Sequence, residues 1–163
     1  MIFNPDDLIR KYAPDRKIEK LLKKGFNLNR ALLTAFSDIP FIDKKELTKV
    51  VLEVAKLYRK KYRGLIKEGL PTNTSKKLAQ NESKLLTHRV QNLVVFKASE
   101  KIKEDLTGEF YIWLPSDAEN PDPLHQLKYG KKYQIGKGEM PGERIGCRCG
   151  MNILTGKKNI DIV

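Results

Sequence analysis

The sequence has 163 residues, of which 40% are hydrophobic and 32% charged, and its formal net charge is +12. This composition excludes an intrinsically disordered chain, and the length predicts a single domain over residues 1–163 that buries roughly two-thirds of its unfolded surface. No apolar run approaches the about 20 residues that cross a bilayer, so no membrane contact is expected.

Nearly all of the net charge lies in residues 1–107. Residues 108–163 hold eight Lys and Arg against seven Asp and Glu, which leaves them close to neutral. A strong positive field attracts polyanions such as nucleic acid or acidic proteins, although Lys-rich helix faces are also common as plain solvated surface. The charge pattern therefore divides the chain into a basic part and a near-neutral part.

Apolar side chains at helical spacing predict three short helices followed by two long ones. The short helices are expected at about residues 5–12, 14–25 and 29–36. The first long helix begins after Asp43, which can cap it, and reaches about Lys67. The second begins at Thr74 or Ser75 and runs toward Gly108. We expect the two long helices to form an antiparallel hairpin.

The outer face of the first long helix carries the densest basic run of the chain. These residues are the predicted nucleic-acid contacts: Lys56, Arg59, Lys60, Lys61, Arg63 and Lys67. His88 lies within the second long helix without a local partner, so it is read as a surface or core-edge residue.

After Gly108 the pattern becomes that of a small antiparallel sheet. The aromatic and β-branched run at residues 110–114 predicts a buried strand, and residues 129–136 predict a hairpin. Residues 147–154 predict a last strand that pairs with residues 110–114, followed by a turn and a weak strand or tail. The fold class is therefore α+β, with an N-terminal helical body and a β-rich C-terminal part.

Two cysteines and one histidine in this β-rich part are candidate metal ligands. Cys147 and Cys149 are too close in sequence for a disulfide of usual geometry. With His125 they supply three ligands of the types that zinc takes, and Asp117 or Asp122 is a candidate fourth. The alternative is two partly buried thiols that pack a small sheet without metal. No other cofactor is expected.

Two enzymatic interpretations use the same region. A thiolate of Cys147 or Cys149 activated by His125 would be a nucleophile. In a metal-free RNA-cleaving site, His125 would be the general acid or base, with Glu143 as its partner and Arg148 or Lys132 stabilising phosphate charge.

The ordered set Trp113, Ser116-Asp117, His125, Gly130, Pro141-Gly142 and Cys147-Arg148-Cys149 resembles the C-terminal domain of phage Mu protein F-like minor head proteins, also called head morphogenesis proteins. The resemblance covers about the last third of the chain. It implies functional or fold-defining roles for eight residues: Trp113, Asp117, His125, Gly130, Pro141, Cys147, Arg148 and Cys149.

This resemblance implies a phage or prophage protein that assists capsid assembly or genome packaging and delivery through contacts with portal proteins, capsid proteins or DNA. Such a protein would act in the bacterial cytoplasm or the virion interior and would not be an enzyme. The alternative hypothesis is a small nuclease or toxin domain that acts on RNA or DNA with His125 as general acid or base.

Overall fold

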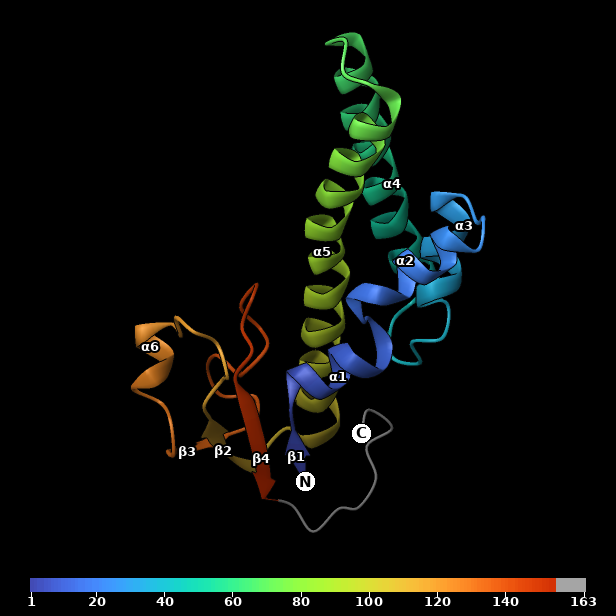
Figure 1. The fold of residues 1–163 in the computed structure, drawn as a ribbon. Coiled ribbons are helices and arrows are strands. Elements are labelled where there is room, and N and C mark those ends of the chain that lie inside the picture. The colour runs from blue at the N-terminus through green and yellow to red at the C-terminus, as the bar shows by residue number, and fades with distance from the viewer. Residues whose placement is uncertain (155–163) are drawn as a thin grey trace. The chain divides into compact units, whose positions relative to one another are not determined.

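The computed structural model describes residues 1–154, apart from the side chains of residue 15 and residues 80–87, and the predicted α+β class is confirmed. The helices are α1 (Pro5–Tyr12), α2 (Asp15–Lys23), α3 (Leu28–Phe36), α4 (Lys44–Lys67), α5 (Thr72–Leu106) and α6 (Pro123–Gln126) (Figure 1). The strands are β1 (Ile2–Phe3), β2 (Phe110–Leu114), β3 (Lys132–Gln134) and β4 (Gly150–Leu154). Among these described elements, no helix combines the length and the apolar composition needed to cross a membrane. The turn and weak strand predicted after residue 154 lie outside the described residues.

The chain divides into two compact units. One contains Met1–Lys11 and the chain from Asn92 onward, and the other contains Tyr12–Gln91. The division falls inside α5 and not at the sequence boundary between residues 107 and 108. We call the first the β-rich unit and the second the helical unit.

Local signals set the ends of the helices in the helical unit. Asp43 caps α4 as predicted, because its side chain accepts a hydrogen bond from Lys45 N at 3.4 Å. The predicted start of the second long helix is wrong: α5 begins at Thr72, just after Pro71. Ser75 is buried, and its hydroxyl donates to Leu70 O at 3.4 Å instead of capping the helix.

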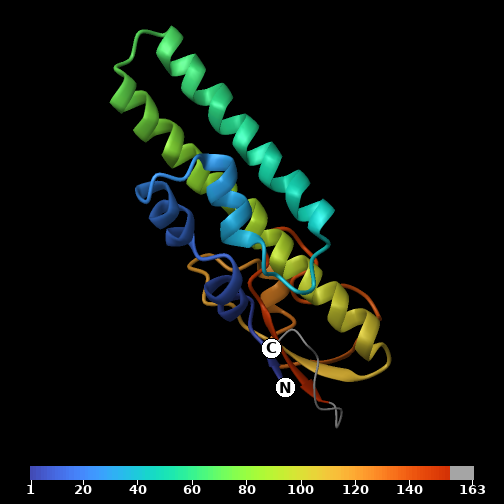
Figure 2. The same ribbon diagram turned by 90° about the vertical axis from the view of Figure 1, so that its right-hand side faces the viewer.

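The first part of α5 runs antiparallel to α4, as Figure 1 and Figure 2 both show, so the predicted hairpin is present. Apolar residues of α3 and α4 form buried core positions of this unit: Ala31, Leu32, Ala35, Phe36, Val51, Val54 and Ala55. Burying each large side chain among them stabilises the fold by roughly 1.5–3 kcal/mol. His88 is exposed on α5, in agreement with its sequence interpretation.

The β-rich unit is built on a four-stranded antiparallel sheet with the order β1-β4-β2-β3. The register pairs Tyr111 with Ile153 and Trp113 with Met151. All four side chains are buried, because alternate residues of a strand point to the same face of the sheet. The predicted pairing of the last strand with residues 110–114 is thus confirmed.

Two sequence expectations for the sheet differ from the structure. The predicted hairpin at residues 129–136 is wrong: the segment contains the single strand β3, which pairs with β2. The edge strand β1 was not predicted, because two residues before a helix start give no alternating pattern. It forms only because Ile2 and Phe3 find Asn152 and Met151 of β4 as partners.

Candidate metal centre

His125 is held in the interior of the β-rich unit by a short capped helix. The Asp122 side chain accepts a hydrogen bond from Leu124 N at 2.8 Å, and Pro123 occupies the first helical position of α6. This single turn directs His125 inward, where only 2% of its surface is exposed. Common helix-start chemistry therefore positions the buried imidazole.

The two cysteines come from the segment that leads into β4. Gly142 N donates to Cys147 Sγ at 3.4 Å, and Gly142 has a φ of +87°, at a position where an added Cβ atom would lie 3.0 Å from Val95 Cγ1 of α5. The preceding carbonyl of Pro141 accepts a hydrogen bond from the buried Ser99 hydroxyl at 2.7 Å. These contacts attach the loop to α5 and hold the thiol beneath it.

The three candidate ligands meet in space. His125 Nδ1 lies 3.6 Å from Cys147 Sγ and 3.6 Å from Cys149 Sγ, and the ligand atoms of the three residues all lie within 4.8 Å of one another. All three residues are buried, and both cysteines are free thiols. The group could therefore hold a metal ion.

Neither predicted fourth ligand belongs to this group. Asp122 caps α6 and forms an ion pair with Arg144, and Asp117 lines a separate pocket of about 100 Å³ beside Phe3 and Arg148. Within the described part of the chain, the clustered His, Cys and acidic ligands are His125, Cys147 and Cys149.

The second ring nitrogen of His125 faces a carboxylate. His125 Nε2 lies 3.5 Å from Glu139 Oε2, in an orientation that makes no hydrogen bond. Partial burial raises the pKa of Glu139, but the hydrogen bond and charge of Lys128 and the charges of Arg144 and His125 outweigh it, so the pKa is lowered. Glu139 is thus an ionised carboxylate next to the imidazole.

Aromatic rings shield the group from solvent. The fully buried Trp113 ring lies 5.1 Å from the His125 ring and 5.9 Å from that of Tyr133, and Lys128 Nζ lies 4.5 Å above it. Tyr129 Oη is 3.9 Å from Cys149 Sγ. The indole nitrogen of Trp113 is buried without a hydrogen-bond partner among the described residues.

The pKa values of the two thiols are shifted in opposite directions. The hydrogen bond from Cys147 lowers the pKa of Cys149 to about 5 against the opposing effect of burial, with further help from Trp113, His125 and Tyr129. The same hydrogen bond, together with burial, raises the pKa of Cys147. The lowered pKa of Cys149 favours its thiolate, which is the form of cysteine that binds metals.

The residues of the RNA-cleaving hypothesis have separate partners. Glu143 binds Lys103 Nζ at 2.7 Å and accepts from Met140 N at 2.9 Å. Arg148 donates to Asn92 Oδ1 at 3.1 Å, and Lys132 lies over the Phe110 ring on the sheet. Within the described structure, no hydrogen bond or ion pair joins His125 to Glu143 or Arg148.

The hypothesis of a thiolate nucleophile requires a thiol that is both close to His125 and accessible to a substrate. The structure does bring His125 to both thiols, but the exposed fractions of Cys147 and Cys149 are 8% and 2%. A substrate carbonyl or phosphate would therefore have little access to either sulfur. The arrangement is that of an enclosed centre.

Other motif residues hold the frame of this centre. Gly130 has a φ of +73°, and its N–H donates to Trp113 O at 2.8 Å, which connects the turn before β3 to β2. Arg148 is partly buried, and burial lowers the pKa of its guanidinium despite the opposing charge of Asp6. Its ion pair with Asp6, at 3.9 Å, joins α1 to the cysteine loop.

Sequence reasoning missed the residues around His125 that only folding brings together. Glu139, Lys128 and Arg144 form a chain of ion pairs with distances of 2.7 Å and 2.9 Å. Nothing in their spacing identifies them, since charged residues in a Gly-rich loop are common. Comparison of the chain with known proteins finds no matching family model, no matching curated protein and no matching solved structure.

Proposed function

We propose that this protein is a phage or prophage minor head protein, a non-enzymatic assembly factor whose β-rich unit is organised around a structural zinc site. The observation that carries the proposal is the convergence of His125, Cys147 and Cys149 on one buried point beside Trp113. Four of the residues that give the resemblance to head morphogenesis proteins, Trp113, His125, Cys147 and Cys149, are thus also residues of this centre.

The spacing of the ligand atoms favours zinc. Zn–S bonds of about 2.3 Å and Zn–N bonds of about 2.05 Å at a tetrahedral angle separate the nitrogen and sulfur by about 3.6 Å. The two distances from His125 Nδ1 to the sulfurs are both 3.6 Å. Bound zinc would act as a cross-link between the α6 turn and the strand β4.

The surroundings of His125 fit the same ion. A histidine that binds metal through one nitrogen usually directs its other N–H at a carboxylate or carbonyl, which fixes the ring and raises its basicity. Glu139 Oε2 lies 3.5 Å from Nε2, close enough for a small rotation of the carboxylate to make this hydrogen bond. With two thiolates and one neutral imidazole, the protein would contribute three of the four tetrahedral positions.

Metal analysis tests the zinc part directly. Protein purified without chelator should contain about one zinc per chain. The Cys149→Ala variant should contain none, whereas Tyr129→Phe, which alters a neighbour of the same sulfur, should keep its zinc. A folded protein without bound metal after equilibration with zinc would contradict the proposal.

The basic face of α4 supports contact with a polyanion. Lys56, Lys60, Arg63 and Lys67 follow one another at intervals of four, three and four residues, which places them on one side of the helix. All four are exposed, and within the described structure none forms an ion pair. In an assembly factor this face would bind genomic DNA or an acidic surface of the portal or capsid, inside the bacterial cell or the virion.

To test this part of the proposal, the protein is incubated with labelled double-stranded DNA and RNA over a series of salt concentrations. Binding and strand integrity are measured in the same samples. We expect intact strands and binding that weakens steeply with salt. Charge reversal at Arg59, Lys60, Lys61 and Arg63 should weaken binding and flatten the salt dependence. Unchanged affinity would remove the DNA-binding part of the proposal, and cleavage that disappears in His125→Ala would favour the nuclease hypothesis.

A further inference from the structure

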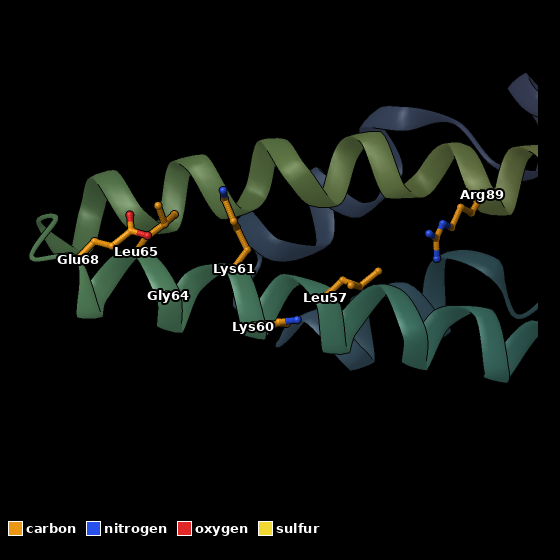
Figure 3. Close-up of a pocket in the computed structure, with 7 residues that line it drawn as sticks. All are labelled: Leu57, Lys60, Lys61, Gly64, Leu65, Glu68 and Arg89. Atoms are coloured by element: carbon orange, nitrogen blue, oxygen red, sulfur yellow. The ribbon is translucent and has the colours of Figure 1, made fainter.

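A second feature of the molecule lies on the helical unit, between α4 and α5. A pocket of about 390 Å³ is lined by Leu57, Lys60, Lys61, Gly64, Leu65 and Glu68 of α4 and by Arg89 of α5 (Figure 3). This volume is within the range of sites that accept ligand groups, roughly 300–1,000 Å³.

The pocket combines an apolar base with a cationic edge. Leu57 and Leu65 supply the apolar surface, while Lys61 points from α4 toward α5 and Arg89 points from α5 toward α4 (Figure 3). Among the described residues, Lys60, Lys61 and Arg89 form no ion pair. Among the described residues that line the pocket, three cations stand against the one carboxylate of Glu68, which gives these residues an excess of positive charge.

The position of Gly64 also indicates that the pocket binds a ligand. It lies in the middle of α4, where glycine destabilises a helix relative to alanine. A Cβ atom added there would meet no atom of the described residues within 4 Å, so their packing does not require a glycine. Because Gly64 lines the pocket, its missing side chain leaves room there for a group from another molecule.

We propose that this pocket binds an acidic amphipathic helix of a partner protein, with an apolar side chain over Gly64 and carboxylates facing Lys61 and Arg89. The inference rests on the proposed assembly function and specifies the chemistry of its protein partner. Leu57, Lys61, Gly64 and Glu68 repeat at intervals of four, three and four residues, so they line one face of α4 along which a helix can lie. A DNA backbone would gain nothing from the apolar base.

The pocket and the basic face of α4 can be tested separately. Lys56 and Arg63 lie on the basic face and do not line the pocket, whereas Lys61 and Arg89 line it. The double variants K61E/R89E and K56E/R63E therefore change the net charge equally and differ only in location. All four side chains are exposed, so neither variant disturbs the core.

The probe is a fluorescein-labelled helical peptide of about 16 residues, long enough to form a helix, with leucines at i, i+4 and i+7 flanked by glutamates. A peptide of the same composition with the leucines scattered over all faces is the control. We measure fluorescence anisotropy with the full chain and its variants, and the same proteins are titrated with double-stranded DNA.

We expect K61E/R89E to weaken peptide binding by at least about tenfold, because charge reversal replaces attraction by repulsion. Gly64→Leu should abolish peptide binding without a change in charge and leave DNA binding intact, and K56E/R63E should weaken DNA binding while the peptide still binds. The inference is overturned if the wild-type chain prefers the scattered peptide or binds neither of the two peptides. It is also overturned if K56E/R63E weakens peptide binding as much as K61E/R89E does, or if a folded Gly64→Leu variant binds the peptide as tightly as the wild type. Loss of DNA binding in K56E/R63E concerns the proposed function alone.

Discussion

Cys149→Ala removes one of the two sulfurs that lie 3.6 Å from His125 Nδ1, and we expect it to abolish the stabilisation of the β-rich unit by zinc. A ligand that binds only the folded state stabilises it by about 4 kcal/mol when its free concentration is 1,000 times its Kd. At roughly 2–8 °C per kcal/mol for units of this size, zinc should raise the Tm of the wild-type protein by at least about 8 °C. The variant should show no zinc-dependent shift.

The assay uses the only tryptophan of the chain. Trp113 is fully buried and its ring lies 5.1 Å from that of His125, so its fluorescence reports on the unit that contains the centre. Thermal unfolding is followed at this signal with excess zinc and with chelator. Tyr129→Phe is the matched control and should retain the shift, because the phenol contacts Cys149 Sγ at 3.9 Å without being one of the clustered ligands. A wild-type Tm that is equal in zinc and in chelator would refute the reasoning.

Three further predictions follow from single positions. Gly64→Ala should raise the free energy of unfolding by about 1 kcal/mol in urea titrations, because the added Cβ enters open space in mid-helix, and a destabilised variant would show that the space is not free. Gly142→Ala should destabilise more than Gly146→Ala in the same titrations, since both have positive φ but only the first would bring a Cβ to 3.0 Å from Val95; equal effects would exclude that contact. The pKa of Glu139 is lowered in the folded state, so its carboxylate stabilises the fold above its unfolded pKa of about 4.3 and this contribution is lost as pH falls through the lower folded value. The stability difference between wild type and Glu139→Gln should therefore be constant above about pH 5 and shrink toward pH 3, and a pH-independent difference would contradict the ion-pair account.

The buried centre links the resemblance to head morphogenesis proteins with the physics of this fold. Trp113, His125, Cys147 and Cys149 are separated in the sequence but lie together in the interior, whereas Arg148 reaches Asp6 and Asn92 outside this group. The identity of the protein as a minor head protein stays a proposal, which the nucleic-acid and peptide experiments test.

Local chemistry made most of the helices predictable. Asp43 caps α4 through its own side chain, and Gly25 follows α2 with a φ of +86°. The aromatic and β-branched run in residues 110–114 likewise predicted β2, because such side chains favour a buried strand. The start of α5 was misjudged because Ser75 bonds to a backbone carbonyl outside the helix instead of acting as a cap.

By itself, the sequence determined the five longer helices, the strands β2 and β4, the imbalance of charge and the residue types able to bind a metal, since each follows from neighbours along the chain. Only the tertiary structure decided that β1 closes the sheet against β4, that Glu139 lies beside His125 Nε2, and that Arg89 of α5 lines the same pocket as Lys61 of α4. His125 and Cys149 are 24 residues apart, and their meeting depends on how β2, α6 and β4 fold back on one another. Local periodicity cannot encode that approach, because it arises from packing between distant segments.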